Sequence, residues 1–350
     1  MFENIDTPAV LIDQIRVEAN MKRLQDYCNA HGIRLRPHIK THKLPGTALQ
    51  QIKCGAVGVT CQKVGEAEIM AEGGVGDILI TYNIIGKSKV ERVRALNDRI
   101  DLAVVADSDF VVSGLSNVLQ NSTKPLTVLV ECDTGMRRCG VQTIEAAMQL
   151  AKDIDAAAGL RFGGLMSYPP TGRISEVNTW LDEAKSLILT NGIECPVVSC
   201  GNSPDLELWH KAPVVTEHRA GTYIYCDRNM ILQGVATEDD CALIVLVTVV
   251  STPTKTRAVI DAGSKALTSD LSLKPGYGLI IGHPGLDISA LSEEHGHITS
   301  DLPHRLQVGQ RLRIIPNHVC PVSNLFDKVH FVRGEKYDQP VSVAARGALT

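Results

Sequence analysis

Between residues 7 and 235, short segments rich in β-branched residues alternate with longer segments whose apolar residues recur every three or four positions. The short segments predict strands, and the longer ones predict amphipathic helices. Strands are predicted at residues 9–12, 33–37, 56–60, 77–80, 101–105, 126–131, 161–166, 196–200 and 214–217. Helices are predicted at residues 15–30, 64–71, 143–154 and 175–189. Repeats of this kind predict an α/β fold with a parallel sheet.

The number of repeats favours a closed barrel over an open sheet. About eight βα repeats without a Gly-x-Gly-x-x-Gly turn are typical of a (β/α)8 TIM barrel rather than a dinucleotide-binding sheet. After residue 235 the pattern changes to strands separated by Gly and Pro turns, at residues 243–251, 257–261, 278–281 and 311–315. We therefore predict a barrel over residues 7–235 and a β domain over residues 236–350.

Composition and charge exclude several classes of protein. A formal net charge of −4 over 350 residues provides no broad basic surface for nucleic acid. No apolar run is long enough for a membrane span, and charged residues interrupt the amino-terminal segment where a signal peptide would be apolar. Ten cysteines without Cys-x-x-Cys spacing predict reduced thiols. We expect a cytoplasmic protein with a small-molecule partner, bound to neither nucleic acid nor membrane.

A basic segment follows the strand predicted at residues 33–37, where residues 36–43 read RPHIKTHK. Pro37 disfavours a helix at this point. A lysine such as Lys40, placed at a strand end beside other cations, has a destabilised ammonium group, which prepares it for imine formation. The alternative is a solvated basic loop, and the spacing alone does not decide between the two.

Two glycine-bearing turns follow the last two strands predicted before residue 235. Backbone amides freed by glycine, together with hydroxyl groups, can surround a phosphate, and late barrel strands commonly do so. The candidate residues are Ser199, Gly201, Asn202 and Ser203 in the first turn, and Gly221, Thr222 and Tyr223 in the second. A pair of ordinary tight turns is the alternative interpretation.

His318 and Cys320 form a His-x-Cys pair near the end of the chain. On a strand, residues two apart project to the same face, so an imidazole and a thiolate there can share one metal ion. Two ligands are a weak signal, because a buried histidine beside a buried thiol gives the same pattern. We treat the pair as a candidate metal site.

Motifs along the whole chain resemble the D-threonine aldolase and D-serine dehydratase family of fold-type III, alanine-racemase-like enzymes. They lie at residues 7–13 (TPAVLID), 36–43, 131–140 (ECDTGMRRCG), 261–266 (DAGSKA), 293–296 (EEHG) and 316–320 (PNHVC). The resemblance implies a barrel that binds pyridoxal 5'-phosphate, with Lys40 as its Schiff-base lysine. It also implies a β domain that includes residues 1–6. A homodimer is implied as well, with active sites where one subunit's barrel meets the other's β domain.

The resemblance also implies which residues surround the cofactor. Arg138, which follows the Asp-Thr-Gly turn at residues 133–135, is implied to approach the cofactor ring or its phenolic oxygen. His38 is a further cofactor-binding candidate, and Gln62 and Tyr168, which follow the strands predicted at residues 56–60 and 161–166, are weaker candidates to line the ring. An ordinary ion pair is the alternative for Arg138, and plain core packing is the alternative for Gln62 and Tyr168.

In the family that the chain resembles, the positions of His318 and Cys320 hold a divalent metal that faces the substrate hydroxyl. The Cys320 thiolate favours zinc, with manganese as the other candidate. We predict a lyase of small D-configured β-hydroxy-α-amino acids, with retro-aldol cleavage to glycine and an aldehyde as the main reaction. Dehydration of D-serine or D-3-hydroxyaspartate to a 2-keto acid and ammonia is the alternative. An amino-acid racemase, which needs no metal pair, is a further one.

Residues 167–172 (SYPPTG) depart from the family pattern. Aldolase members carry a histidine in a loop after the tyrosine that corresponds to Tyr168, and that histidine serves as the catalytic base. No histidine matches it in this sequence. Lys40, His38 and His42 therefore remain as candidate bases, and the sequence does not choose among them.

Overall fold

The computed structural model describes residues 2–350, which form two compact units. The first, called here the barrel unit, comprises Arg23–Lys40, Leu44–Gly221 and Gly347–Thr350. The second, the β unit, comprises residues 2–22, Thr41–Lys43 and Thr222–Arg346. Helix α1 (Gln14–Ala30) begins in the β unit and ends in the barrel unit.

Eight parallel strands form the sheet of the barrel unit, in the order β2-β9-β8-β7-β6-β5-β4-β3. They are β2 (Arg34–Leu35), β3 (Val59–Cys61), β4 (Asp77–Asn83), β5 (Asp101–Ala106), β6 (Leu126–Glu131), β7 (Leu160–Met166), β8 (Val197–Cys200) and β9 (Glu217–His218). A parallel bridge between His38 and Thr60 links the two ends of this order. The predicted (β/α)8 barrel is therefore confirmed.

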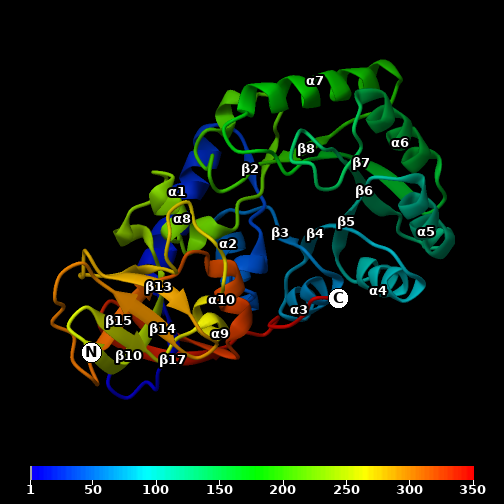
Figure 1. The fold of residues 1–350 in the computed structure, drawn as a ribbon. Helices are drawn as coiled ribbons and strands as arrows, with labels where there is room; N and C mark the ends of the chain where they lie inside the picture. Colours follow the sequence, from blue (N-terminus) through cyan, green and yellow to red (C-terminus); the bar gives the residue numbers. More distant parts are fainter. Residues whose placement is uncertain (1) are drawn as a thin grey trace. The chain divides into compact units, whose positions relative to one another are not determined.

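Helices alternate with these strands along the chain. They are α2 (Pro45–Cys54), α3 (Val64–Glu72), α4 (Lys87–Asn97), α5 (Asp109–Leu119), α6 (Ile144–Ala156) and α7 (Ile174–Thr190), and α4 to α7 lie outside β4 to β8 (Figure 1). Helix α6 shows why they form. Its buried residues Ala147, Leu150, Ala151 and Ile154 recur at helical spacing, and the Thr143 hydroxyl accepts the backbone N–H of Ala146 at 3.1 Å.

Nine strands form the sheet of the β unit, along the path β13-β14-β11-β10-β1-β16-β17 with β15 pairing both β10 and β12. They are β1 (Ala9–Asp13), β10 (Leu243–Thr254), β11 (Arg257–Ile260), β12 (Leu279–Ile280), β13 (Asp287–Leu291), β14 (Gly296–Thr299), β15 (Arg311–Ile315), β16 (Lys328–Arg333) and β17 (Lys336–Ser342). Helices α8 (Arg228–Leu232), α9 (Ser264–Leu267) and α10 (Val319–Leu325) interrupt this series. The prediction of a second, mainly β part is confirmed.

The first predicted strand does not belong to the barrel. β1 pairs antiparallel with β10, where Ala9 lies opposite Leu246, and parallel with β16, where Leu11 lies opposite His330. The prediction that residues 9–12 form a barrel strand is therefore wrong. These four residues are all buried, as in any central strand covered on both faces, so their pattern does not reveal which sheet they join. The other eight predicted strands all lie in the barrel.

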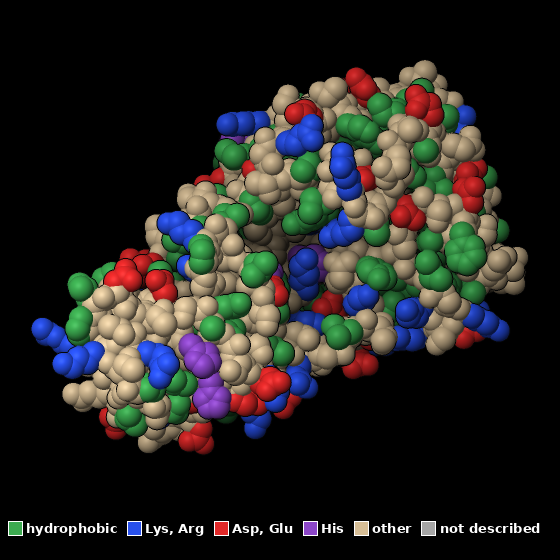
Figure 2. Space-filling model, viewed as in Figure 1, with side chains coloured by type: hydrophobic (Ala, Val, Ile, Leu, Met, Phe, Trp, Pro, Cys, Tyr) green, Lys and Arg blue, Asp and Glu red, His purple; other side chains and the backbone are tan. Residues whose placement is uncertain are grey.

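Charges of both signs are mixed on one face of the molecule. Figure 2 shows Lys and Arg side chains interspersed with Asp and Glu on the face in view. Within residues 2–350, no helix combines the length and the apolar character that crossing a membrane requires.

Candidate functional site

Lys40 lies just after β2, in the short 3-10 helix Ile39–Thr41. Its side chain is half-buried, and within residues 2–350 its Nζ atom makes no hydrogen bond or ion pair. Its backbone N–H donates to Nδ1 of His38 at 3.3 Å, so the His38 proton lies on Nε2, 3.1 Å from Oε1 of Gln62. Gln62 in turn donates to the carbonyl of Thr81 at 2.8 Å. The chain of bonds fixes the loop that carries Lys40 and brings His38 and Gln62 together.

Lys43, the other lysine of the basic segment, is placed differently. It adopts a positive φ of 57°, is buried, and donates from Nζ to the carbonyl of Ala345 at 3.2 Å. His42 beside it is also buried. Lys43 therefore has a structural role in the β unit, and Lys40 is the lysine with an available amine.

Arg138 and Tyr168 meet in the barrel unit. The Arg138 guanidinium carbon lies 4.9 Å from the centre of the Tyr168 ring, within the range of a cation–π interaction. Arg138 belongs to the loop between Cys132 and Val141, two residues that form a parallel β-bridge. The Asp133 carboxylate braces this loop by accepting backbone N–H groups at 2.9 and 3.0 Å. The structure thus holds Arg138 in place over an aromatic ring.

Glu131, at the carboxyl end of β6, was noticed in the sequence only as part of a motif. Its carboxylate is buried and accepts a hydrogen bond from Asn83 at 3.3 Å. Ligand atoms of Asp107, Glu131 and Cys139 lie within 4.8 Å of one another. Burial raises the pKa of Glu131 to about 7; Arg138 opposes the shift and Asp107 adds to it. Glu131 is therefore a carboxyl group that titrates near neutral pH at the barrel's carboxyl end.

Arg219, which follows β9, is a further residue that sequence reasoning missed. It is buried, and its Nη2 atom donates to the carbonyl of Ser167 at 2.6 Å. Its Nε atom is buried as well and has no hydrogen-bond partner among residues 2–350. Burial lowers the pKa of Arg219 from its usual range. An orphaned cationic donor of this kind fits a bound acceptor group, because a buried donor without a partner costs about 1–3 kcal/mol.

In the first turn proposed for phosphate, the Ser199 and Asn202 side chains bind other protein groups, so its backbone is the part available to a ligand. The Ser199 hydroxyl donates to the Glu217 carboxylate at 2.7 Å, and the Asn202 amide donates to Asp205 at 3.0 Å. Both side chains are thus occupied inside the protein. Gly201 has a φ of +126°, and a Cβ there would overlap the His218 ring, so only glycine fits.

Free N–H groups remain in both turns. Within residues 2–350, the amides of Asn202, Ser203 and Gly221 donate to no protein group. Such amides at the ends of β8 and β9 suit an anion. Thr222 and Tyr223 follow in the 3-10 helix Thr222–Ile224, where Tyr223 is buried.

His318 and Cys320 do not lie on a strand, contrary to the premise of the predicted metal pair. His318 caps the amino end of α10, and Cys320 lies in the first turn of that helix. The turn nevertheless brings them together, since a hydrogen bond links their side chains. Burial opposes protonation of His318, but the Cys320 thiolate and Asp227 raise the pKa of the imidazole to about 11. Hence the pair attracts a positive charge, as two ligands of a cation would.

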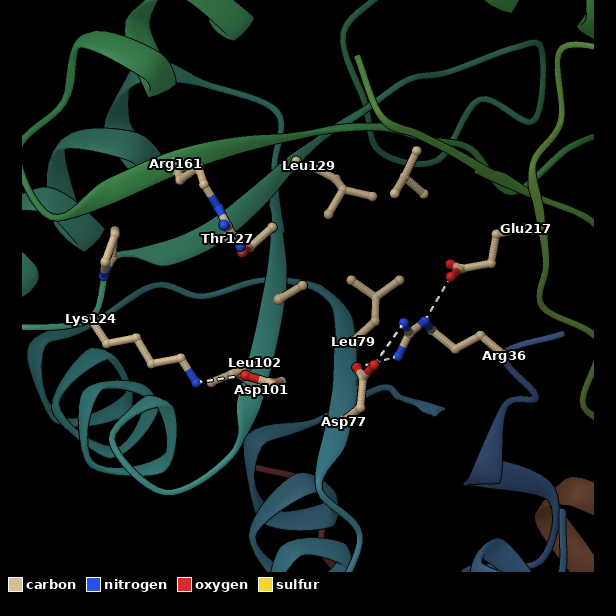
Figure 3. Close-up of a pocket in the computed structure, with 14 residues that line it drawn as sticks. Arg36, Asp77, Leu79, Asp101, Leu102, Lys124, Thr127, Leu129, Arg161 and Glu217 are labelled. Carbon is tan, nitrogen blue, oxygen red and sulfur yellow. Dashed lines mark hydrogen bonds and ion pairs between the residues drawn. The ribbon is translucent and has the colours of Figure 1, made fainter. Parts of the chain in front are cut away.

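A cavity of about 270 Å³ lies at the opposite, amino ends of the barrel strands. Figure 3 shows Arg36 between Asp77 and Glu217, at 2.6 and 2.9 Å, and Lys124 beside Asp101 at 2.8 Å. These charges neutralise one another. In barrels this end serves stability, whereas chemistry occurs at the carboxyl ends where Lys40, Glu131 and Arg219 lie.

Comparison with known families and proteins gives a consistent result over the whole chain. The alanine racemase N-terminal domain family matches residues 12–229, and the serine dehydratase domain family matches residues 242–332. D-threonine aldolase of Arthrobacter sp is 32% identical over 361 residues, covering 98% of this chain and 93% of that protein.

Two solved structures share the fold of the whole chain. D-threonine aldolase from Filomicrobium marinum has a TM-score of 0.94 at 30% identity, covering 100% of this chain and 98% of the other. A D-threo-3-hydroxyaspartate dehydratase mutant in the metal-free form has a TM-score of 0.87 at 28% identity, covering 97% of each chain. The similarity therefore includes both units.

Proposed function

This chain belongs to the alanine racemase N-terminal domain family, and on that basis we propose that it is a pyridoxal-phosphate-dependent lyase of small D-configured β-hydroxy-α-amino acids. Its proposed reaction is retro-aldol cleavage to glycine and an aldehyde. One observation carries the proposal: the chain combines Lys40, whose amine has no partner within residues 2–350, with the hydrogen-bonded pair of His318 and Cys320. A racemase would use the lysine but has no need of the pair.

The residues of the barrel unit fit pyridoxal phosphate. Lys40 would hold the cofactor, which when bound supplies an electron sink for negative charge at the substrate α-carbon. The free amides of Asn202, Ser203 and Gly221 would bind its phosphate. Arg219 would offer its unpartnered Nε–H to an acceptor on the ring. These donors lack protein partners within residues 2–350, which supports the assignment.

Other predicted residues keep the groups of the barrel unit in place. His38 and Gln62 anchor the loop of Lys40 through their mutual hydrogen bond. Tyr168 supports Arg138, which would keep a fixed positive charge beside the ring. Proton acceptors at the barrel's carboxyl end include Lys40 and Glu131, the latter with a pKa raised to about 7 by burial.

His318 and Cys320 would hold one divalent metal, with zinc favoured by the thiolate and manganese as the other candidate. A metal there supplies a Lewis acid that lowers the pKa of a substrate hydroxyl or helps it to leave. Two protein ligands leave positions open for substrate and water. The dehydratase mutant was solved in a metal-free form, which supports a metal site in that relative.

Dehydration to a 2-keto acid and ammonia is the second candidate reaction. Cys320 favours it, because a soft thiolate selects zinc, and a zinc ion also assists the departure of hydroxide. Similarity to the D-threo-3-hydroxyaspartate dehydratase agrees with this candidate. The two reactions share the lysine and the metal and differ in which bond breaks.

Product analysis separates the candidates. The holoenzyme with added metal is incubated with D-threonine, D-allo-threonine, D-serine and D-3-hydroxyaspartate. Glycine with an aldehyde supports retro-aldol cleavage, whereas ammonia without glycine replaces it by dehydration. Interconversion of alanine enantiomers without either product would move the protein to the racemases.

The proposal includes a homodimer in the cytoplasm. The family resemblance supports the dimer, and sedimentation tests it. No disulfide links any of the ten cysteines in the part of the chain that the structure describes, which supports a reducing compartment.

A further inference from the structure

Asp227 lies beside the His318–Cys320 pair and has no role in the function proposed above. Its side chain is almost completely buried, with 1% exposed, and it directly precedes helix α8. A buried carboxylate is costly unless hydrogen bonds satisfy it. The contacts of its two oxygen atoms therefore indicate its role.

The two oxygens of Asp227 have different partners. Oδ1 accepts the backbone N–H of Met230 at 3.0 Å and so caps α8. Oδ2 lies 2.8 Å from Nδ1 of His318 and accepts the backbone N–H of Val319 at 3.3 Å. One oxygen is thus explained by helix capping, and the other faces the histidine.

The backbone holds this arrangement rigid. Arg228 donates its N–H to the carbonyl of Pro316 at 3.1 Å, and Asn229 donates to that of Asn317 at 3.3 Å. The Arg228 guanidinium also donates to the Asn317 side chain at 3.0 Å. Residues 227–229 and 316–319 are therefore joined by several hydrogen bonds, and these bonds keep Asp227 beside His318.

We propose that Asp227 is a positioning residue for the metal site: it fixes the proton of His318 on Nδ1 and thereby presents Nε2, together with Cys320, to the metal. The inference rests on the proposed function, because it requires the metal to be bound there. A carboxylate that accepts from one ring nitrogen selects the tautomer and increases the basicity of the other nitrogen. Loss of such a partner lowers metal affinity by roughly 10- to 100-fold.

Asp227→Asn tests this role while leaving the helix cap in place. The amide oxygen still accepts from Met230, whereas the amide NH2 group now faces His318, donates to Nδ1 and leaves the Val319 N–H without its acceptor. That donation moves the imidazole proton to Nε2, the atom needed by the metal. Zinc affinity of the holoenzyme, measured by competition with a chromophoric chelator, should fall about 10- to 100-fold. Cofactor content should not change.

Asp240→Asn is the matched control in the same unit. Asp240 also accepts a backbone N–H, that of Thr237 at 2.7 Å, and caps a short helix. Its replacement should leave zinc affinity within about twofold, a difference of less than 0.5 kcal/mol. Equal zinc affinity in Asp227→Asn and the wild type would overturn the inference.

A measurement on the wild-type protein covers the case in which Asp227→Asn does not fold. Nitrogen-15 NMR of the zinc-loaded holoenzyme should show the proton of His318 on Nδ1 and the metal on Nε2. Metal on Nδ1 would contradict the role of Asp227 and leave the lyase proposal intact. A wild-type protein that binds no zinc or manganese at all would instead refute the metal part of the proposed function.

Discussion

The hydroxyl oxygen of Thr41 lies 3.2 Å from the sulfur of Cys320. Thr41 is the residue after Lys40, so the proposed cofactor lysine is a chain neighbour of a residue that contacts the proposed metal ligand. A hydroxyl that donates to a thiolate stabilises its charge. The basic segment at residues 36–43 thus carries both the proposed cofactor lysine and a residue that contacts Cys320.

Thr41→Val should weaken zinc binding. Valine keeps the shape of the side chain but removes the hydroxyl that lies 3.2 Å from the Cys320 sulfur, and with it a hydrogen bond that can stabilise the thiolate. We expect zinc affinity roughly tenfold lower, equal to about 1.4 kcal/mol for a hydrogen bond to a charged group. Competition with a chromophoric chelator measures the change, and an unchanged affinity would show that the contact has no energetic role.

Borohydride reduction of the holoenzyme should attach the cofactor to Lys40. Lys43 is buried and donates to the carbonyl of Ala345, so it offers no amine to a carbonyl group. Peptide mapping after reduction identifies the labelled lysine. Lys40→Ala should abolish labelling, whereas Lys43→Met should lower stability and leave labelling in the folded fraction. A label on Lys43 would overturn the assignment.

Removal of the metal should stop turnover and leave the cofactor in place. The proposed ligands of the metal, His318 and Cys320, belong to the β unit, and the lysine belongs to the barrel unit. Dialysis against a chelator, followed by measurements of cofactor absorbance and activity, tests the separation. Activity that survives complete metal loss would refute the catalytic role of the metal.

Much of the barrel could be predicted from the sequence because its strands and helices are local patterns. The partners of β1 could not, since Ala9–Asp13 is an apolar run that any central strand would accept. The pair of His318 and Cys320 was found, but its strand setting was wrong. His318 is the cap of α10, and Cys320 lies in the first turn of that helix. This arrangement brings the two side chains together, as a strand would.

Two candidate site residues that the sequence did not reveal, Glu131 and Arg219, lie at the ends of barrel strands. Glu131 and Arg219 are distant in the chain and become neighbours only when β6 and β9 close into one barrel, so that the charge of Arg219 affects the pKa of Glu131. For Ser199, in contrast, the sequence predicted a role in the site and the structure shows a different contact. Its hydroxyl suggested a phosphate ligand, but the barrel places the Glu217 carboxylate 2.7 Å away.

Glu217→Gln should destabilise the protein. Glu217 is buried, with 2% of its side chain exposed, and accepts hydrogen bonds from Arg36 at 2.9 Å and Ser199 at 2.7 Å. The change removes one of the two carboxylates beside the Arg36 guanidinium and leaves Asp77 at 2.6 Å, so we expect a loss of about 1–3 kcal/mol, the usual range for a hydrogen bond to a charged group. Urea unfolding measures the loss. As a control, Lys265→Ala breaks an exposed pair with Glu294 and should change little.

Glu131 should make stability depend on pH. Its folded-state pKa, about 7, lies above its ordinary value of 4.5, chiefly because of burial. Protonation therefore favours the folded state, and this contribution is present below pH 4.5 and lost as pH rises through 7. The difference amounts to a few kcal/mol, roughly 1.4 per pKa unit.

Glu131→Gln should remove that dependence. Urea unfolding of wild type and variant at about pH 5 and about pH 8, which span most of the interval between the two pKa values, gives the difference directly. The wild type should lose more stability than the variant between the two values. Parallel losses in both proteins would show that Glu131 does not titrate in this range.

The position of β1 has a consequence for biosynthesis. A ribosome releases Ala9–Asp13 early, whereas its sheet partners Leu243–Thr254 and Lys328–Arg333 emerge late. All the barrel strands precede these two partners in the chain, so the barrel can fold while β1 is still unpaired. An unpaired strand of this kind is prone to associate with other chains. Chaperones that shield the first residues during translation should therefore raise the yield of folded protein.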